Sequence, residues 1–183
     1  MPSPPGLTAV IVDVPAASPV VGSWRARFDS SAPLGVPPHV TILFPFLSLP
    51  AMTATDRADL AAIVGAEPGF TVTFAALGTF ATVEGTPEVL YLEPSPAEPF
   101  RRLTEALAAR WPQCPPYEGA FDEVIPHLTV TETAPPEQVS AARRAIARVL
   151  PIRASIDTVT LIDFDGTRWR RHMQFPMGGT GRS

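Results

Sequence analysis

Apolar and polar positions along the first half of the chain predict alternating strands and helices. The run LTAVIVDV (7–14) is rich in β-branched residues and ends at a proline, which is typical of a strand. The run over 18–28 opens with Ser18 and Pro19, residues that favour the start of a helix. The other elements predicted in this half are a strand containing His39, a helix over 53–66 and a strand over 70–80.

The second half of the chain runs through the same order of predicted elements. Its first helix, over 95–111, opens with Ser95 and Pro96 and so mirrors the Ser-Pro pair of the first half. His39 and His127 are 127 − 39 = 88 positions apart, close to the offset between the two opening strands. The other elements predicted here are strands over 89–94 and around His127, a helix over 135–150, and strands over 154–164 and 168–177.

This repetition predicts an α+β fold of two lobes, each a β-α-β-α-β unit, related by a pseudo-two-fold axis. Equivalent residues of two such lobes face each other across the groove between them. We therefore expect a central cleft that carries both histidines. We expect a single domain with lobes of roughly 1–85 and 86–177, followed by a flexible tail at 178–183.

The two strands that contain these histidines share the pattern His-apolar-Thr-apolar, written HVTI in the first half and HLTV in the second. Because side chains alternate along a strand, His39 and Thr41 face one way, and so do His127 and Thr129. Two facing imidazoles suit in-line displacement at phosphorus, since one ring removes a proton while the other donates one. The threonine hydroxyls can donate to the non-bridging oxygens. The pattern alone leaves open which histidine is the acid.

Other chemistries find less support in the sequence. Neither histidine strand offers a second metal ligand on its histidine face, so we expect no metal and no cofactor. The chain has no G-x-S-x-G, P-loop or G-x-G-x-x-G motif. Cys114 is the one cysteine and lies in a proline-rich run, which excludes a disulfide framework and favours an inert thiol. The third histidine, His172, lacks the threonine and is interpreted as a surface or strand-edge residue.

Composition narrows the class of protein further. Of the 183 residues, 45% are apolar and 17% are charged, which is typical of a globular domain. The net charge of −4 excludes a broad basic surface for a long polyanion, so any nucleic-acid substrate should be small or a strand end. No segment reaches the roughly 20 apolar residues of a membrane span. We expect a soluble, cytoplasmic protein without a membrane partner, and a monomer.

With both motifs identified, the sequence resembles the 2H phosphoesterase superfamily, which includes the 2′-5′ RNA ligase-like proteins and the RNA 2′,3′-cyclic phosphodiesterases. The duplicated layout extends the resemblance over nearly the whole chain. It implies a metal-independent phosphoesterase, a hydrolase whose two motifs line a central cleft. By position, His39 matches the proton donor in hydrolysis and His127 the proton acceptor, while Thr41 and Thr129 match the phosphate-contacting residues.

The resemblance favours hydrolysis of a 2′,3′-cyclic phosphate, on a nucleotide or an RNA end, to a 2′-phosphate, with 2′-5′ ligation as the reverse reaction. Two alternatives stay open: a phosphodiesterase for a non-RNA cyclic phosphate or 2′-5′ oligoadenylate, and a nucleotide-binding module with little catalysis. Tyr117 and Phe121 flank the second motif and are candidates for base stacking or for the rim of the cleft. The arginines that form either a basic rim or ordinary solvated surface are Arg101, Arg102, Arg168, Arg170 and Arg171.

Overall fold

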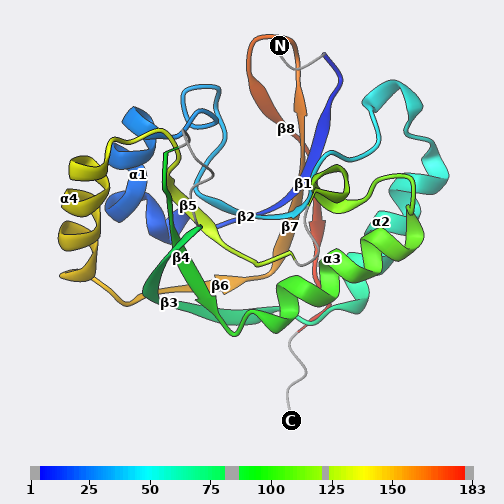
Figure 1. The fold of residues 1–183 in the computed structure, drawn as a ribbon. Helices are drawn as coiled ribbons and strands as arrows, with labels where there is room; N and C mark the ends of the chain where they lie inside the picture. Colours follow the sequence, from blue (N-terminus) through cyan, green and yellow to red (C-terminus); the bar gives the residue numbers. More distant parts are fainter. Residues whose placement is uncertain (1–4, 81–86, 121–123, 180–183) are drawn as a thin grey trace.

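The computed structural model describes residues 5–80, 87–120 and 124–179. Twelve helices and strands within these ranges build the fold, and three short 3-10 turns connect some of them (Figure 1). The first half contains β1 (Thr8–Asp13), α1 (Ser18–Phe28), β2 (His39–Leu43), α2 (Ala54–Ala66) and β3 (Phe70–Phe80). The rest are β4 (Val89–Ser95), α3 (Glu98–Arg110), β5 (Leu128–Thr131), α4 (Pro136–Ala147), β6 (Ile152–Ile156), β7 (Thr158–Phe164) and β8 (Trp169–Pro176).

Two four-stranded antiparallel sheets form the centre of the molecule. One has the strand order β2-β1-β7-β8 and the other the order β5-β4-β3-β6. The predicted α+β fold class is therefore confirmed, with β1 and β2 in one sheet matching β4 and β5 in the other. Strands from each half join the sheet of the other half: β3 pairs with β4, and β7 pairs with β1.

This exchange bears on the predicted lobes of 1–85 and 86–177, because each sheet combines strands from both halves of the sequence. Their boundary falls at segment 81–86, which lies outside the described residues. One hydrophobic cluster runs through both sheets, from Val10 and Val40 on one side to Leu92 and Val130 on the other. The helices cover the outer faces: α1 and α4 pack on the sheet of β5, and α2 and α3 on the sheet of β2 (Figure 1).

Three predicted elements need correction. The single strand expected over 154–164 is two strands, β6 and β7, which separate at Asp157 and join different sheets. The helix expected over 95–111 begins only at Glu98. Gly178, which we expected in the flexible tail, forms a bridge with Pro68, and its backbone N–H donates to the carbonyl of Glu67 at 2.8 Å. Residues 180–183 of that tail lie outside the described residues.

Side chains alternate along each motif strand. One set points into the core, and the other set lies on the face that carries the histidine and threonine of the motif. In β2, Val40 and Ile42 are buried in the core, while His39 and Thr41 are half-buried on the opposite face. At β5, Leu128 and Val130 are buried in the core, while Thr129 and His127, the residue just before the strand, are half-buried. The period of two in the sequence therefore places both motifs on non-core faces.

Candidate active site

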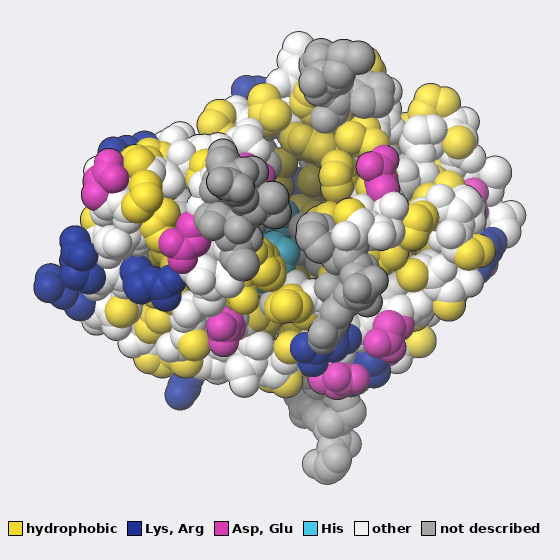
Figure 2. All heavy atoms as spheres, viewed as in Figure 1, with side chains coloured by type: hydrophobic (Ala, Val, Ile, Leu, Met, Phe, Trp, Pro, Cys, Tyr) yellow, Lys and Arg dark blue, Asp and Glu magenta, His cyan; other side chains and the backbone are white. Residues whose placement is uncertain are grey.

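The two motif strands approach each other in the middle of the molecule. β2 and β5 form the near ends of the two sheets, and their residues contact one another. A positive charge on His127 would lower the pKa of His39, as expected for two rings on neighbouring strands. Figure 2 shows histidine side-chain atoms in a hollow near the centre of the face in view. The contact between β2 and β5 therefore brings the two motif segments side by side.

A backbone carbonyl fixes the orientation of the His39 ring. Its Nδ1 lies 2.8 Å from the carbonyl oxygen of Pro37, which can only accept, so Nδ1 carries the proton and donates it. The other ring nitrogen, Nε2, lies 3.2 Å from the hydroxyl oxygen of Thr41. In the neutral ring Nε2 is therefore the basic atom, and it lies beside the threonine hydroxyl on the cleft face.

His127 is held in the same way from the other sheet. Its Nδ1 donates to the carbonyl oxygen of Ile125 at 2.7 Å, so Nε2 is again the atom left to react. In both motifs the accepting carbonyl belongs to the residue two places before the histidine, with a buried proline between them. Proline has no backbone N–H. The segment that leads into each strand can therefore turn a carbonyl toward the ring without leaving an N–H of that proline unpaired.

Burial lowers the pKa of both imidazoles. The pKa of His39 falls to about 4, first because burial disfavours the charged ring, with smaller contributions from the positive charges of Arg25 and His127. The hydrogen bond to Pro37 and the carboxylate of Asp29 act in the opposite direction. Burial also lowers the pKa of His127. Both rings are neutral in the free protein at neutral pH, which leaves either Nε2 able to accept a proton.

The hydroxyl of Thr41 lies next to the His39 ring. Thr41 shares a hydrogen bond with the side chain of Tyr117, which arrives from the turn at Pro116–Gly119. Tyr117 and Glu118 have positive φ angles of 51° and 56°, and the Tyr117 backbone N–H donates to the carbonyl of Phe44. The predicted rim residue Tyr117 thus reaches the site through Thr41. Its companion in that prediction, Phe121, lies outside the described residues.

An aromatic pair, not expected from the sequence, packs against His127. Phe80 and Tyr91 stack with ring centroids 4.4 Å apart, and both contact the imidazole, at 4.8 Å and 5.4 Å. Tyr91 lies opposite Thr129 in the ladder and across Gly78, where any Cβ atom would overlap the Tyr91 ring. Gly78 within the strand over 70–80 was the available signal, since glycine in a strand often marks a close approach.

A buried ion pair supports the segment before His39. Arg25 donates through Nε to Asp29 at 2.8 Å, and the two side chains are only 3% and 4% exposed. The same guanidinium donates to the carbonyl of Val36 and to the hydroxyl of Ser31. Arg25 therefore ties helix α1 to the chain that carries Pro37, the residue that orients His39.

The other candidate residues lie away from this cleft or are paired. Burial raises the pKa of the Cys114 thiol, and His172 lies on edge strand β8, 3.4 Å from Asp163. Salt bridges join Arg102 to Glu67, Arg170 to Asp165 and Arg171 to Asp13.

In the described part of the chain, no group of three or more His, Cys, Asp or Glu side chains could hold a metal ion. Within those ranges, no helix is both long and apolar enough to cross a membrane.

Comparison with known proteins agrees with this geometry. A model of the 2′-5′ RNA ligase superfamily matches residues 12–168. The fold and the paired motifs define a phosphoesterase or ligase-like enzyme of the two-histidine class. The chain belongs to the 2′-5′ RNA ligase superfamily. No curated protein matched it.

Solved structures of two proteins show the same fold. LigT of E. coli in complex with 3′-AMP is 19% identical, with a TM-score of 0.58 over 95% of this chain and 99% of that one. LigT in complex with NADP+ is 21% identical, with a TM-score of 0.56 over 96% and 99% of the two chains. TT0787 of Thermus thermophilus is 21% identical, with a TM-score of 0.55 over 94% and 98%.

Proposed function

We propose that this enzyme hydrolyses a 2′,3′-cyclic phosphate, on a nucleotide or at an RNA end, to a 2′-phosphate. The observation that carries the proposal is the matched pair of imidazoles, each with Nδ1 held by the carbonyl two residues earlier, so that Nε2 is the atom left to react. A phosphorus atom between two such nitrogens has a base on one side and an acid on the other, as in-line displacement needs. The 3′-AMP bound by LigT supports a nucleotide as the substrate class.

In this proposal His127 accepts a proton from the attacking water through Nε2, and His39 donates one to the departing 3′ oxygen. Water oxygen forms the new bond to phosphorus as the bond to the 3′ oxygen breaks, and the 2′ ester remains. Thr41 and Thr129 donate their hydroxyl hydrogens to the non-bridging oxygens, where the negative charge grows. With a 5′-hydroxyl in place of water as the attacking group, the same step joins two RNA ends through a 2′-5′ bond, and the 3′ oxygen again leaves.

The acid must be protonated when the substrate is bound, although burial lowers the pKa of His39 in the free protein. A bound anionic phosphate favours the charged ring and so raises that pKa in the complex. Substrate binding and protonation of His39 are therefore coupled in this mechanism. The single domain acts as one unit here, since the acid and the base come from different sheets.

The test is hydrolysis of 2′,3′-cyclic AMP by purified enzyme in the presence of EDTA, followed by chromatography. We expect turnover to survive chelation, because the motifs supply acid, base and phosphate donors without a metal. Parallel reactions with 3′,5′-cyclic AMP and 2′-5′ oligoadenylate separate the cyclic phosphodiesterase from the alternative substrates. Tight nucleotide binding without turnover of any of them would favour the binding-module alternative, and rescue by a divalent ion after chelation would contradict the two-histidine mechanism.

A further inference from the structure

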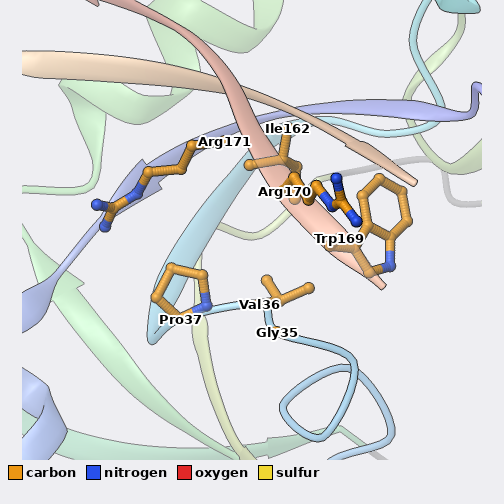
Figure 3. A pocket seen from close by; sticks show the side chains of 7 residues that line it. All are labelled: Gly35, Val36, Pro37, Ile162, Trp169, Arg170 and Arg171. Carbon is orange, nitrogen blue, oxygen red and sulfur yellow. The ribbon is translucent and has the colours of Figure 1, made fainter. Parts of the chain in front are cut away.

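We propose that the hollow between Trp169 and Arg171 binds the nucleotide next to the reacting end of the substrate, so that the enzyme prefers an RNA 3′ end to a mononucleotide. The proposal rests on the proposed function, since it assigns the neighbour of the phosphate that the two histidines cleave. The hollow has a volume of about 110 Å³ and is lined by the loop before β2 and by strands β7 and β8 (Figure 3).

The hollow adjoins the candidate active site directly. Pro37, whose carbonyl orients His39, is also part of its lining. Val36 and Ile162 close it with apolar surface, and the indole of Trp169 forms a further part of the wall. The ring of Trp169 is held by contacts with Phe44 and Phe164, with centroids 6.1 Å and 5.5 Å away. A half-buried, fixed indole at the edge of a hollow is a suitable surface for stacking a base.

Arg171 adds a positive charge to this hollow on the side of β1. Its guanidinium lies 2.8 Å from the carboxylate of Asp13, across β7, and Asp13 is the ladder partner of His39. The Arg171 side chain is 56% exposed whereas that of Asp13 is only 12% exposed. An incoming anion therefore meets the guanidinium first, and the five N–H donors of arginine leave capacity beyond the pair with Asp13.

The spacing fits a neighbouring nucleotide better than the reacting one. Trp169 belongs to β8, three strands from β2 in the sheet, which is on the order of 14 Å at 4.7–4.9 Å for each strand. Arg171 reaches back across β7 to Asp13 on β1, two of these three strand spacings. A chain that starts at the histidines can thus place its next phosphodiester at Arg171 and its next base on Trp169. A mononucleotide has no second phosphate for the arginine.

Calorimetric titration tests this with two probes that need no turnover: 3′-AMP and the adenosine dinucleotide that ends in a 3′-phosphate. We expect the wild-type enzyme to bind the dinucleotide about tenfold tighter, the effect of one charge-assisted contact with some stacking. The preference should disappear in Arg171→Gln. It should also disappear in Asp13→Asn/Arg171→Gln, which avoids a buried unpaired carboxylate. The matched control is Arg153→Gln, an exposed arginine of β6 in the other sheet, where the preference should remain.

Equal binding of the two probes by the wild-type enzyme would overturn the proposal. A preference for the dinucleotide that survives in both Arg171 variants would also overturn it. So would an equal loss of affinity for both probes in these variants, because that result indicates only a structural role for Arg171. The outcome is independent of catalysis. If the enzyme hydrolyses 2′,3′-cyclic AMP but shows no preference for the dinucleotide, the proposed function stands and the subsite is refuted. If the enzyme hydrolyses nothing but prefers the dinucleotide, and the Arg171 variants lose that preference, the subsite stands and the proposed function is refuted.

Discussion

At the scale of single residues, backbone hydrogen bonds that the motif sequence does not reveal determine which nitrogen of each imidazole can react. The carbonyls of Pro37 and Ile125 hold the Nδ1 atoms of His39 and His127, and this leaves both Nε2 atoms for chemistry. The common face of the histidine and threonine in each motif could be predicted because strand alternation depends only on spacing in the sequence. The tautomer of each histidine could not be predicted, because it depends on where the carbonyl two residues before the ring points.

The two histidines should carry most of the catalysis. We expect His39→Ala or His127→Ala to lower kcat by about 10² to 10⁴, the usual contribution of one positioned acid or base. The double variant should lose far less than the product of the two losses, because the rings act on one phosphate. The measurement is the steady-state hydrolysis of 2′,3′-cyclic AMP.

His172→Ala is the matched control for those variants. His172 lies on edge strand β8 near Asp163, and we expect its replacement to leave kcat within about twofold, as for surface changes generally. A folded His39→Ala enzyme with the wild-type rate would contradict the assignment of the acid.

The lowered pKa values predict an acidic optimum for the free enzyme. Above the higher of the two pKa values the donor ring is neutral, and below the lower one the acceptor ring is charged, so kcat/KM is bell-shaped. Because burial lowers the pKa of His39 to about 4 and also lowers that of His127, the maximum should lie below pH 6.5. The profile of kcat should peak at higher pH, since bound phosphate raises both values. A kcat/KM maximum above pH 7 would argue against these two rings as the acid and the base.

At the scale of elements, the site depends on how the chain enters each motif strand. Arg25, on α1, holds the segment that leads into β2 through Asp29, Ser31 and the carbonyl of Val36. Nothing in the pattern of α1 marks Arg25, because a polar residue in a helix normally predicts an exposed side. The spacing of four residues between Arg25 and Asp29 can be read from the sequence, but the burial of both side chains cannot, because it depends on the rest of the fold.

Removal of this arginine should destabilise the enzyme strongly. We expect Arg25→Met to lower the free energy of unfolding by about 3–5 kcal/mol, because it leaves the carboxylate of Asp29 buried without its partner. Arg27→Met on the same helix is the control. The Arg27 side chain is exposed, with its guanidinium over the Phe28 ring, and its loss should cost about 1 kcal/mol or less. Urea unfolding followed by circular dichroism measures both; similar losses in the two variants would show that the buried pair is not an important support.

At the scale of the whole molecule, the sequence predicted the repeat but not the exchange of strands between sheets. Local patterns find strands such as β3 and β7, and they give the α+β class, yet pairing partners are chosen by tertiary packing. The same limit hid the split between β6 and β7, because the strand-like pattern over 154–164 does not show that the chain changes sheet at Asp157. It also hid the contact of Phe80 and Tyr91 with His127, since all three residues come from different strands or loops.

The exchange ties the two halves together and bears on how the site is kept in place. One core cluster spans both sheets, so neither half can move as an independent body without breaking that packing. In the proposed mechanism, the two imidazoles then keep a fixed line through the phosphate between them. A fixed line permits only one oxygen of a bound cyclic phosphate to leave.

Phosphorus NMR of the product from 2′,3′-cyclic AMP, with EDTA present, therefore tests the central claim most directly. With His127 as base and His39 as acid, the 3′ oxygen leaves and the product should be adenosine 2′-phosphate alone. The same reaction run with both histidines replaced by alanine gives the background of spontaneous hydrolysis. A single 2′-phosphate resonance that depends on both histidines is the predicted result, and a 3′-phosphate or a mixture of the two isomers would contradict the account.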